Sequence, residues 1–317
     1  MRHDPSFSGR TWMPGRWLKA AALALAFAVS GGVPDPALAQ AAKPGAPAAP
    51  AAAAAPAAMP AAATSLVRVP DGRLLAPDIA RIVMRGELVV AMLGVDTPPF
   101  FYEKKGELMG LEVDLAKSIA KELGVNVRFN RNAKSFNGVV DTVARGDADI
   151  GVSKLSRTLA RTQVISFSQP YLVMNHALIL NRVKFAQFAR DRALPEVIRG
   201  FNGSIGVIAK SSFEDYAKRY FPNAKIKTYP DWPLVLKALK QGDVIGAYRD
   251  EFEVKRILKE DPTESLLLRT VTFKDLEDTL GIAVGIGDPV LLAFINEFLT
   301  QRTDKLTVNK VLGAIEK

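Results

Sequence analysis

The 317-residue chain contains no cysteine and only two histidines, one of them His3 near its start. Without cysteine the chain can form no disulfide, no lipid-modified cysteine and no thiolate metal site. Two histidines also give little basis for a histidine-rich metal centre. The sequence shows no Walker motif, no catalytic Ser/His/Asp set and no nucleic-acid-binding signature. We therefore expect no metal, no cofactor and no nucleic-acid partner.

Long stretches of one charge are missing as well, although the formal net charge is +9. The first 39 residues hold four basic and two acidic residues, a net charge of +2, so the remainder carries +7. These positive residues are interspersed with acids, which is typical of a solvated surface. The chain is 48% hydrophobic, which is ample material for a folded core.

The longest apolar segment near the amino terminus, residues 20–29, is shorter than the roughly 20 residues of a membrane-spanning helix. Arg10, Arg16 and Lys19 precede it, and the sequence Ala37-Leu38-Ala39 follows. A positive region, a short apolar region and an A-x-A site are the three parts of a secretory signal peptide. We predict cleavage after Ala39 and export to the periplasm. An uncleaved membrane anchor is the alternative.

Alanine and proline make up almost all of residues 40–64, a composition that cannot form a core. We predict a semi-extended linker over residues 40–69. From about residue 70 the sequence becomes globular, and strand and helix patterns alternate in two similar halves. The predicted domains are a signal peptide at 1–39, the linker at 40–69, the first part of lobe 1 at 70–174, lobe 2 at 175–272 and a return to lobe 1 at 273–317.

The first half begins with a buried-strand pattern at residues 88–92 and a helix pattern at 113–123. Leu115, Ile119 and Leu123 share one helix face, and Gly124 suits the helix end. A strand at 125–129, a second helix ending near Gly146 and a strand at 149–152 complete this half. Alternation of strands and helices predicts a parallel sheet flanked by helices.

The second half repeats this order with strands at residues 204–208, 226–229 and 244–248. Ser211 and Glu214 have capping-box spacing before a helix that runs to Tyr220. Residues 140–147 and 235–243 share the end of a helix followed by Gly-Asp. Asp288 and Pro289 are typical of the first positions of a helix, which falls outside the second repeat. We therefore predict two α/β lobes that the chain joins twice, with a hinge between them.

Five phrases in order carry a family resemblance: 86–116 with Pro98-Pro99-Phe100, 146–171, 205–216, 242–250 and 281–289. Over residues 80–300 the chain resembles the periplasmic amino-acid-binding proteins of ABC importers, of the lysine/arginine/ornithine, histidine and glutamine type. The resemblance implies the type II periplasmic-binding-protein fold, two α/β lobes with the ligand in the cleft between them. It also implies an ABC permease in the inner membrane as partner, and we expect a monomer.

The same resemblance implies a set of ligand-binding residues. Arg161 occupies the place of the arginine that binds the ligand carboxylate, a match to the fork of a guanidinium. Asp250 occupies the place of the acid that pairs with the ligand's ammonium, and it could also cap the helix that follows. Further positions that match binding residues or lie close to the predicted cleft are Ser156, Thr158, Phe136, Ser211, Ser212 and Asp96.

Two positions depart from the family pattern. Thr97 stands where several relatives have an aromatic residue, and Lys154 stands where some have serine. Because Lys154 and Arg157 add positive charge near the predicted cleft, one hypothesis is a ligand with an acidic side group, such as a dicarboxylic amino acid. A solvated lysine is the alternative.

The sequence therefore predicts an extracytoplasmic binding protein that captures an amino acid or similar small carboxylate by hinge closure and delivers it to an importer. Two alternatives stay open. The first is a periplasmic enzyme on the same fold, of the cyclohexadienyl dehydratase kind, which needs a proton donor that the quoted phrases do not supply. The second is a sensory or partner-presenting binding protein, which neighbouring permease and ATPase genes would argue against.

Overall fold

A computed structural model describes residues 65–316 of the chain. The predicted signal peptide and residues 40–64 of the predicted linker lie outside the described residues. The last residues predicted as linker contain a strand, because β1 (Val67–Arg68) pairs with β2 (Leu74–Leu75) in a small antiparallel hairpin. None of the helices in the described part combines the length and apolar character that crossing a membrane requires.

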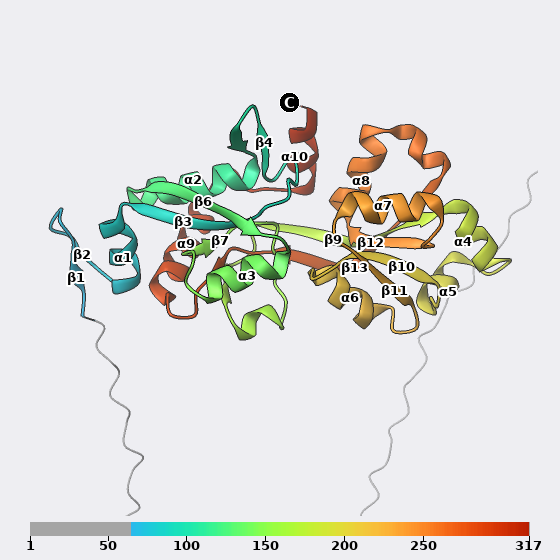
Figure 1. Ribbon diagram of the computed structural model, residues 1–317, viewed down its shortest axis with the longest axis horizontal. Helices are drawn as coiled ribbons and strands as arrows, with labels where there is room; N and C mark the ends of the chain where they lie inside the picture. The colour runs from blue at the N-terminus through green and yellow to red at the C-terminus, as the bar shows by residue number, and fades with distance from the viewer. Residues whose placement is uncertain (1–64, 317) are drawn as a thin grey trace, which may run out of the picture. The chain divides into compact units, whose positions relative to one another are not determined.

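The first lobe is built on a five-stranded sheet of mixed direction, with α2 on one side and α3 on the other (Figure 1). Its interior strand β3 (Glu87–Leu93) is buried along almost its whole length and pairs in parallel with both neighbours, as a continuous apolar run predicts. The full strand order is β6 (Asn126–Ala133), β3, β7 (Ile150–Gly151), β14 (Ala283–Val284) and β8 (Ser166–Phe167). The helices of this lobe are α1 (Pro77–Arg85), α2 (Leu111–Leu123), α3 (Phe136–Ala144) and α9 (Pro289–Gln301). The last helix, α10 (Val308–Gly313), contacts the helix at Glu251–Glu260 and the strand at Leu172–Asn181.

The second lobe repeats this plan with a second five-stranded sheet. The strand order is β11 (Lys225–Tyr229), β10 (Ser204–Ile208), β12 (Gly246–Asp250), β9 (Leu172–Asn181) and β13 (Leu268–Leu280). Five helices surround it: α4 (Arg182–Ala189), α5 (Leu194–Arg199), α6 (Ser212–Tyr220), α7 (Trp232–Gln241) and α8 (Glu251–Glu260). The short elements elsewhere in the described residues are β4 (Tyr102–Lys104), β5 (Glu107–Met109) and the 3-10 turns Arg161–Gln163, Pro262–Leu266 and Ala314–Glu316.

Two long antiparallel strands, β9 and β13, join the lobes (Figure 1). They pair from Leu172 opposite Leu280 to Asn181 opposite Leu268. The pairing shifts between Phe273 and Glu277, where β13 bulges. After β13 the chain enters β14, which lies between β7 and β8 of the first sheet. The chain thus passes from one lobe to the other through two neighbouring strands.

Some helices end at the glycines that the sequence predicts, whereas one predicted capping box does not form. Gly124 and Gly242 end α2 and α7 with positive φ of 72° and 78°, as expected for glycine at this position. The predicted capping box of α6 does not form, because the Ser211 hydroxyl donates to the carbonyl of Ile208. Glu214 instead accepts the N–H of Lys210.

Asp288 and Pro289 take the first positions of α9, as predicted, but the Asp288 side chain makes no capping hydrogen bond to that helix. Asp78 at the start of α1 takes that role. Its Oδ2 accepts the N–H groups of Val290 and Leu291 at 2.9 and 3.0 Å. The free N–H groups at the start of α9 therefore find their acceptor in a residue of α1, which is distant in the sequence.

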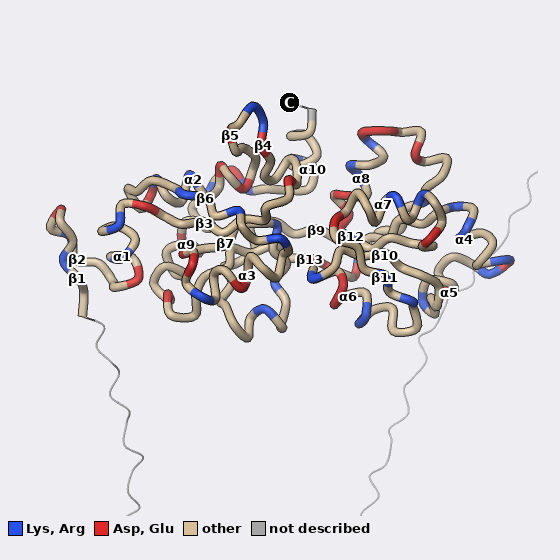
Figure 2. Tube along the Cα trace, in the orientation of Figure 1, with Lys and Arg blue, Asp and Glu red and all other residues tan. Residues whose placement is uncertain are grey.

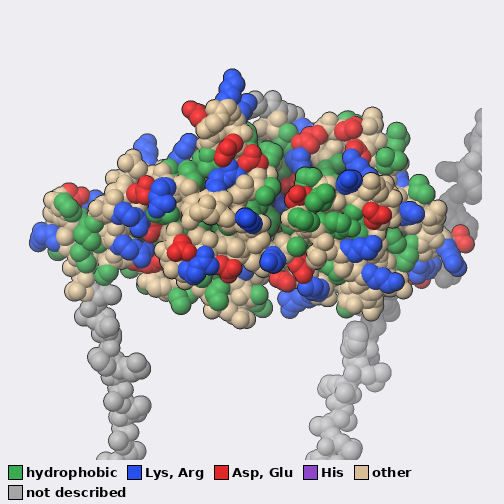
Figure 3. All heavy atoms as spheres, in the orientation of Figure 1, with side chains coloured by type: hydrophobic (Ala, Val, Ile, Leu, Met, Phe, Trp, Pro, Cys, Tyr) green, Lys and Arg blue, Asp and Glu red, His purple; other side chains and the backbone are tan. Residues whose placement is uncertain are grey.

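Charges on the surface are mixed, as the composition predicts. Basic and acidic residues are interspersed along the trace of both lobes (Figure 2), and side chains of both signs occur on the face drawn in Figure 3. No extended field of one sign appears on that face.

Candidate ligand-binding cleft

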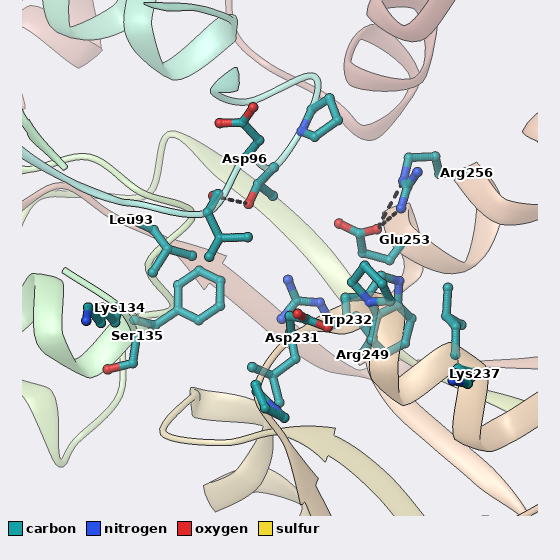
Figure 4. A pocket seen from close by; sticks show the side chains of 18 of the residues that line it. Leu93, Asp96, Lys134, Ser135, Asp231, Trp232, Lys237, Arg249, Glu253 and Arg256 are labelled. Atoms are coloured by element: carbon teal, nitrogen blue, oxygen red, sulfur yellow. Dashed lines mark hydrogen bonds and ion pairs between the residues drawn. The ribbon is translucent and has the colours of Figure 1, made fainter. Parts of the chain in front are cut away.

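A cleft of about 620 Å³ lies between the two lobes. Its volume is within the range of small-molecule sites. Figure 4 shows Leu93, Asp96 and Lys134 of the first lobe on one side, with Trp232 and Glu253 of the second lobe facing them. Much of the wall is apolar, formed by Leu93, Val95, Pro98, Phe136, Ile208, Pro230, Trp232, Pro233 and Leu236.

Deeper between the lobes is a second, much smaller cavity of about 10 Å³. Phe136 and Arg249 line both spaces, so the inner cavity adjoins the cleft. Room of this size suits about one water molecule. An amino acid can therefore enter the inner cavity only if the lobes move apart. Its lining is Phe136, Lys154, Ser156, Ser212, Phe213, Arg249, Asp250 and Asp278.

Lys154 carries its ammonium from the first lobe into the second. Its Nζ lies 3.0 Å from Asp250 Oδ2 and 2.9 Å from Glu253 Oε1. It also lies 4.8 Å and 5.1 Å from the ring centroids of Phe100 and Phe252. Burial acts to raise the pKa of Glu253, but Lys154, together with the neighbouring arginines, lowers it to about 2. The ammonium of Lys154 is thus paired with Asp250 and Glu253 of the protein itself. The hypothesis that Lys154 selects a ligand with an acidic side group therefore loses its support, because that hypothesis needs a lysine whose charge faces the ligand.

The backbone at Lys154 has a left-handed φ of 48° and is held by Glu112, a residue the sequence analysis did not single out. Both carboxylate oxygens of Glu112 accept the Lys154 N–H, at 2.8 and 2.9 Å. The Tyr171 hydroxyl donates to the same carboxylate. Burial raises the pKa of Glu112 to about 7, against these hydrogen bonds, which lower it. Glu112 therefore fixes the backbone of Lys154, a residue that lines the inner cavity.

Two further contacts join the lobes beside Lys154. The hydroxyls of Ser156 and Ser212 lie 2.8 Å apart across the inner cavity. Nearby, the N–H of Asn137 donates to the carbonyl of Lys210 at 3.3 Å. Direct polar contacts thus join the lobes, one of them between Ser156 and Ser212, which were both predicted to bind the ligand.

Arg161, predicted to bind the ligand carboxylate in the cleft, is buried and lines neither the cleft nor the inner cavity. Its Nε and Nη2 both donate to Asn137 Oδ1, at 3.2 and 3.0 Å, and its Nη1 donates to the Ser156 carbonyl at 2.9 Å. Burial lowers the pKa of Arg161, against Asp278, whose charge raises it. The guanidinium therefore holds the loop that carries Ser156 in this arrangement of the lobes.

Asp250 is buried at the end of β12 and lines the inner cavity, and its Oδ2 is ion-paired but makes no hydrogen bond among the described residues. Oδ1 accepts the N–H of Glu253 and caps α8, as the sequence analysis allowed. Oδ2 forms the ion pair with Lys154. The acid predicted to receive the ligand's ammonium thus already has an ammonium beside it.

The remaining predicted residues are divided between three places. Phe136, Ser156 and Ser212 line the inner cavity, and Asp96 and Thr97 line the outer cleft. The Asp96 carboxylate is paired with Arg131 at 2.7 Å. Thr158 and Ser211 line neither space and serve the backbone instead, because Thr158 Oγ1 accepts the N–H of Arg161 and Ser211 donates to Ile208.

Arg249 is the main cavity residue that the sequence analysis missed. Its guanidinium lies 5.5 Å from the ring centroids of Phe136 and Phe213 and 5.8 Å from that of Trp232. Its side chain is 5% exposed, and its nearest acid, Asp250, is 3.6 Å from Nε. That Nε has no hydrogen-bond partner among the described residues. The signal available in the sequence was its place just before Asp250 at the end of a predicted strand.

Asp278 was also missed. It lies in β13, one of the two strands that join the lobes, and its buried Oδ1 has no hydrogen-bond partner among the described residues. Burial raises the pKa of Asp278 to about 6, and the neighbouring Asp250 adds to the rise, while a hydrogen bond from Ser156 and the charges of Lys154 and Arg249 lower it. No feature of the hinge sequence distinguishes this aspartate from Asp275.

Two lobes joined by paired strands, with charged and aromatic side chains between them, define a class of small-molecule binding protein. Residues 88–313 match the family model of the bacterial extracellular solute-binding proteins, family 3. The chain belongs to this family, and the resemblance seen in the sequence is confirmed. The family's description places its members outside the cytoplasm.

Curated relatives in this family are binding proteins. The chain is 25% identical over 213 residues to a probable histidine-binding protein of Neisseria gonorrhoeae, covering 66% of this chain and 75% of that one. It is 26% identical over 204 residues to the ABC transporter arginine-binding protein 1 of Escherichia coli, covering 64% of this chain and 79% of that one.

Solved structures agree with this. The amino acid ABC transporter substrate-binding protein AbpA of Streptococcus pneumoniae, bound to L-arginine, matches with a TM-score of 0.61 and 26% identity, covering 74% of this chain and 98% of that one. An ancestral amino-acid-binding protein, described as a precursor of cyclohexadienyl dehydratase, matches with a TM-score of 0.59 and 26% identity, covering 74% of this chain and 97% of that one. The two-lobed α/β fold predicted from the sequence is thereby confirmed.

Proposed function

We propose that the protein captures an amino acid or a similar small carboxylate between its lobes in the periplasm and delivers it to an ABC permease in the inner membrane. The observation that carries this proposal is the inner cavity, where buried charges of both signs from the two lobes face one another. The names of the relatives, which include histidine- and arginine-binding proteins, support the ligand class.

Hinge closure is the mechanism that this geometry supports best. The strands β9 and β13 carry the connection between the lobes, and the inner cavity is too small to admit an amino acid without their separation. A ligand that contacts both lobes favours the closed form by its difference in affinity for the two forms. The permease would then recognise the closed surface. Phe136 and Trp232, which line the cleft of the binding protein, would pack against the ligand's side chain.

A thermal-shift panel of the twenty amino acids and common small carboxylates tests the proposal. At a ligand concentration of about 100 Kd we expect a gain of about 2.7 kcal/mol in the free energy of unfolding. Small-angle scattering with and without the best binder then tests closure. A panel in which no compound raises the unfolding midpoint would contradict binding. Binding without a change in scattering would contradict closure alone.

Delivery to a permease needs a separate measurement. The purified protein, loaded with the best binder, should stimulate ATP hydrolysis by the permease complex reconstituted in proteoliposomes. Binding without stimulation would leave the binding function in place and point to the sensory alternative.

A further inference from the structure

The outer cleft is the space that can receive the side chain of a bound amino acid. The family resemblance places the ligand's ammonium at Asp250, which lines the inner cavity. Phe136 and Arg249 line both spaces, so a side chain that leaves the inner cavity passes these two residues and enters the outer cleft. At about 620 Å³ this cleft has the size of sites that hold drug-sized ligands. Its lining therefore decides which side chains the protein accepts.

Much of that lining is apolar, and it includes an aromatic ring from each lobe. The indole of Trp232 comes from the start of α7 in the second lobe, and the ring of Phe136 comes from the start of α3 in the first. Figure 4 shows Trp232 facing Leu93 of the first lobe across this space. A large apolar side chain that fills the cleft removes its own surface and that of the wall from water, and so gains affinity.

The guanidinium of Arg249 favours aromatic side chains among the apolar ones. It lies 5.5 Å from the ring centroid of Phe136 and 5.8 Å from that of Trp232. A ligand ring placed beside Trp232 would lie near the same cation, which the face of an aromatic ring attracts. A saturated side chain of equal size has no such attraction, and a cationic side chain would meet the like charge of Arg249.

The acidic residues of the cleft offer little to a cationic side chain. Five basic and three acidic residues line the cleft, a net charge of +2. Both oxygens of Glu253 are paired, one with Lys154 and the other with Arg256. Asp96 is paired with an arginine of β6. Asp231 has no ion pair in the described part of the chain, but its Oδ1 accepts an N–H group and caps α7.

We propose that the ligand of this protein is an amino acid with a large aromatic side chain, which the outer cleft selects through Trp232 and Arg249, and that the cleft rejects cationic amino acids. This inference rests on the proposed function and deepens it by naming the class of side chain. The amino-acid group itself stays at the residues that the family resemblance assigns. Trp232 is then a specificity-determining residue, which distinguishes the protein from relatives that are named for binding arginine.

Titration calorimetry of the wild-type protein with matched amino acids tests the selection. L-Phenylalanine is compared with L-cyclohexylalanine, its saturated counterpart. L-Norleucine is compared with L-lysine, which has the same carbon chain and adds an ammonium. We expect L-phenylalanine to bind about fivefold more tightly than L-cyclohexylalanine, and L-norleucine to bind at least about 30-fold more tightly than L-lysine.

Variants of α7 test the role of Trp232. For Trp232→Leu, which keeps the wall apolar but removes the indole, we expect a loss of about 10-fold in affinity for L-phenylalanine and of less than about threefold for L-norleucine. Leu234→Ala is the matched control, because Leu234 lies on the same helix, is 40% exposed and lines neither space. It should change both affinities by less than about twofold.

The unfolding midpoint and circular dichroism of each variant show whether it is folded. If Trp232→Leu is not, Trp232→Phe replaces it, and we then expect a loss of about threefold for L-phenylalanine, because a smaller ring remains. The comparison of ligands on the wild-type protein tests the selection without any variant.

Preference for another class of side chain would overturn the inference. If a cationic, anionic or aliphatic amino acid of the panel binds more tightly than the aromatic ones, the side-chain class is wrong and the proposed function stands. Where that amino acid is L-arginine or L-lysine, a loss of its advantage in Asp231→Asn would identify Asp231 as the acid that selects it. Equal losses for L-phenylalanine and L-norleucine in Trp232→Leu would contradict the role of the indole. If no compound of the panel binds the wild-type protein, the proposed function itself fails.

Discussion

Lys154 of the first lobe and Asp250 of the second form an ion pair of 3.0 Å in which the side chains are 2% and 1% exposed. Glu253 accepts from the same ammonium at 2.9 Å. This contact links the two lobes through buried side chains. It stabilises the present arrangement of the lobes by a contact that comes from the protein itself.

We expect Lys154→Met to lower the free energy of unfolding by about 3 kcal/mol, because it leaves two buried carboxylates without their shared cation. Urea denaturation measures this loss. The control is Lys218→Met, which breaks an exposed pair with Glu214 of 2.7 Å and should cost less than about 1 kcal/mol. Equal, small losses in the two variants would show that the interlobe pair does not stabilise the fold.

The pH dependence of the protein's free energy of unfolding should show the raised pKa of Glu112. Its pKa rises from 4.5 to about 7 in the folded protein, so its unfolded form loses the proton first. Its contribution is therefore complete below pH 4.5 and is lost as the pH rises through about 7. Relative to Glu112→Gln, whose side chain stays neutral, the wild-type protein should lose ~3 kcal/mol between pH 4.5 and 8.

Urea denaturation of both proteins across this range tests that prediction. His176, whose pKa burial lowers to about 4, affects both proteins equally and cancels in the difference. Glu214→Gln is the control of opposite sign, since its pairing with Lys218 helps to lower the pKa of that carboxylate despite its burial. A stability difference between the two proteins that stays constant over this range would show that the pKa of Glu112 is not raised in the folded protein.

The hydroxyl contact between Ser156 and Ser212 should be measurable as a coupling between the lobes. In a double-mutant cycle of Ser156→Ala and Ser212→Ala we expect an interaction free energy of about 1 kcal/mol in urea denaturation. Ser118→Ala combined with Ser212→Ala is the control, because the Ser118 hydroxyl donates to Asp114 within its own helix. Additive effects in both cycles would mean that the contact across the cavity contributes nothing in solution.

Local pattern was enough to predict most of the fold. The apolar run in β3, the shared helix face of α2 and the glycine at its end are all determined within about 15 residues, so hydrophobic period and φ preference identify them. The repeated order of strands and helices then predicted two lobes, which the family comparison confirms.

The site was harder to predict because it depends on partners far apart in the chain. The sequence motif around Arg161 gives its place after a strand, but not that Asn137 accepts two of its hydrogen bonds. Similarly, nothing local shows that Lys154 reaches Glu253, 99 positions away. Buried charges choose their partners by packing, so a motif can identify a position without fixing its contacts.

The start of α9 offers a last test of such long-range contacts. Asp78 Oδ2 accepts two N–H groups of this helix, whereas Asp288, the residue at the usual capping position, makes only a partly exposed pair with Arg81 of 3.2 Å. We therefore expect Asp78→Ala to lower the free energy of unfolding by about 2 kcal/mol and Asp288→Ala by less than about 1 kcal/mol. Urea denaturation of the two variants measures both values. A larger loss in Asp288→Ala would mean that the local residue caps the helix in solution and that Asp78 is dispensable there.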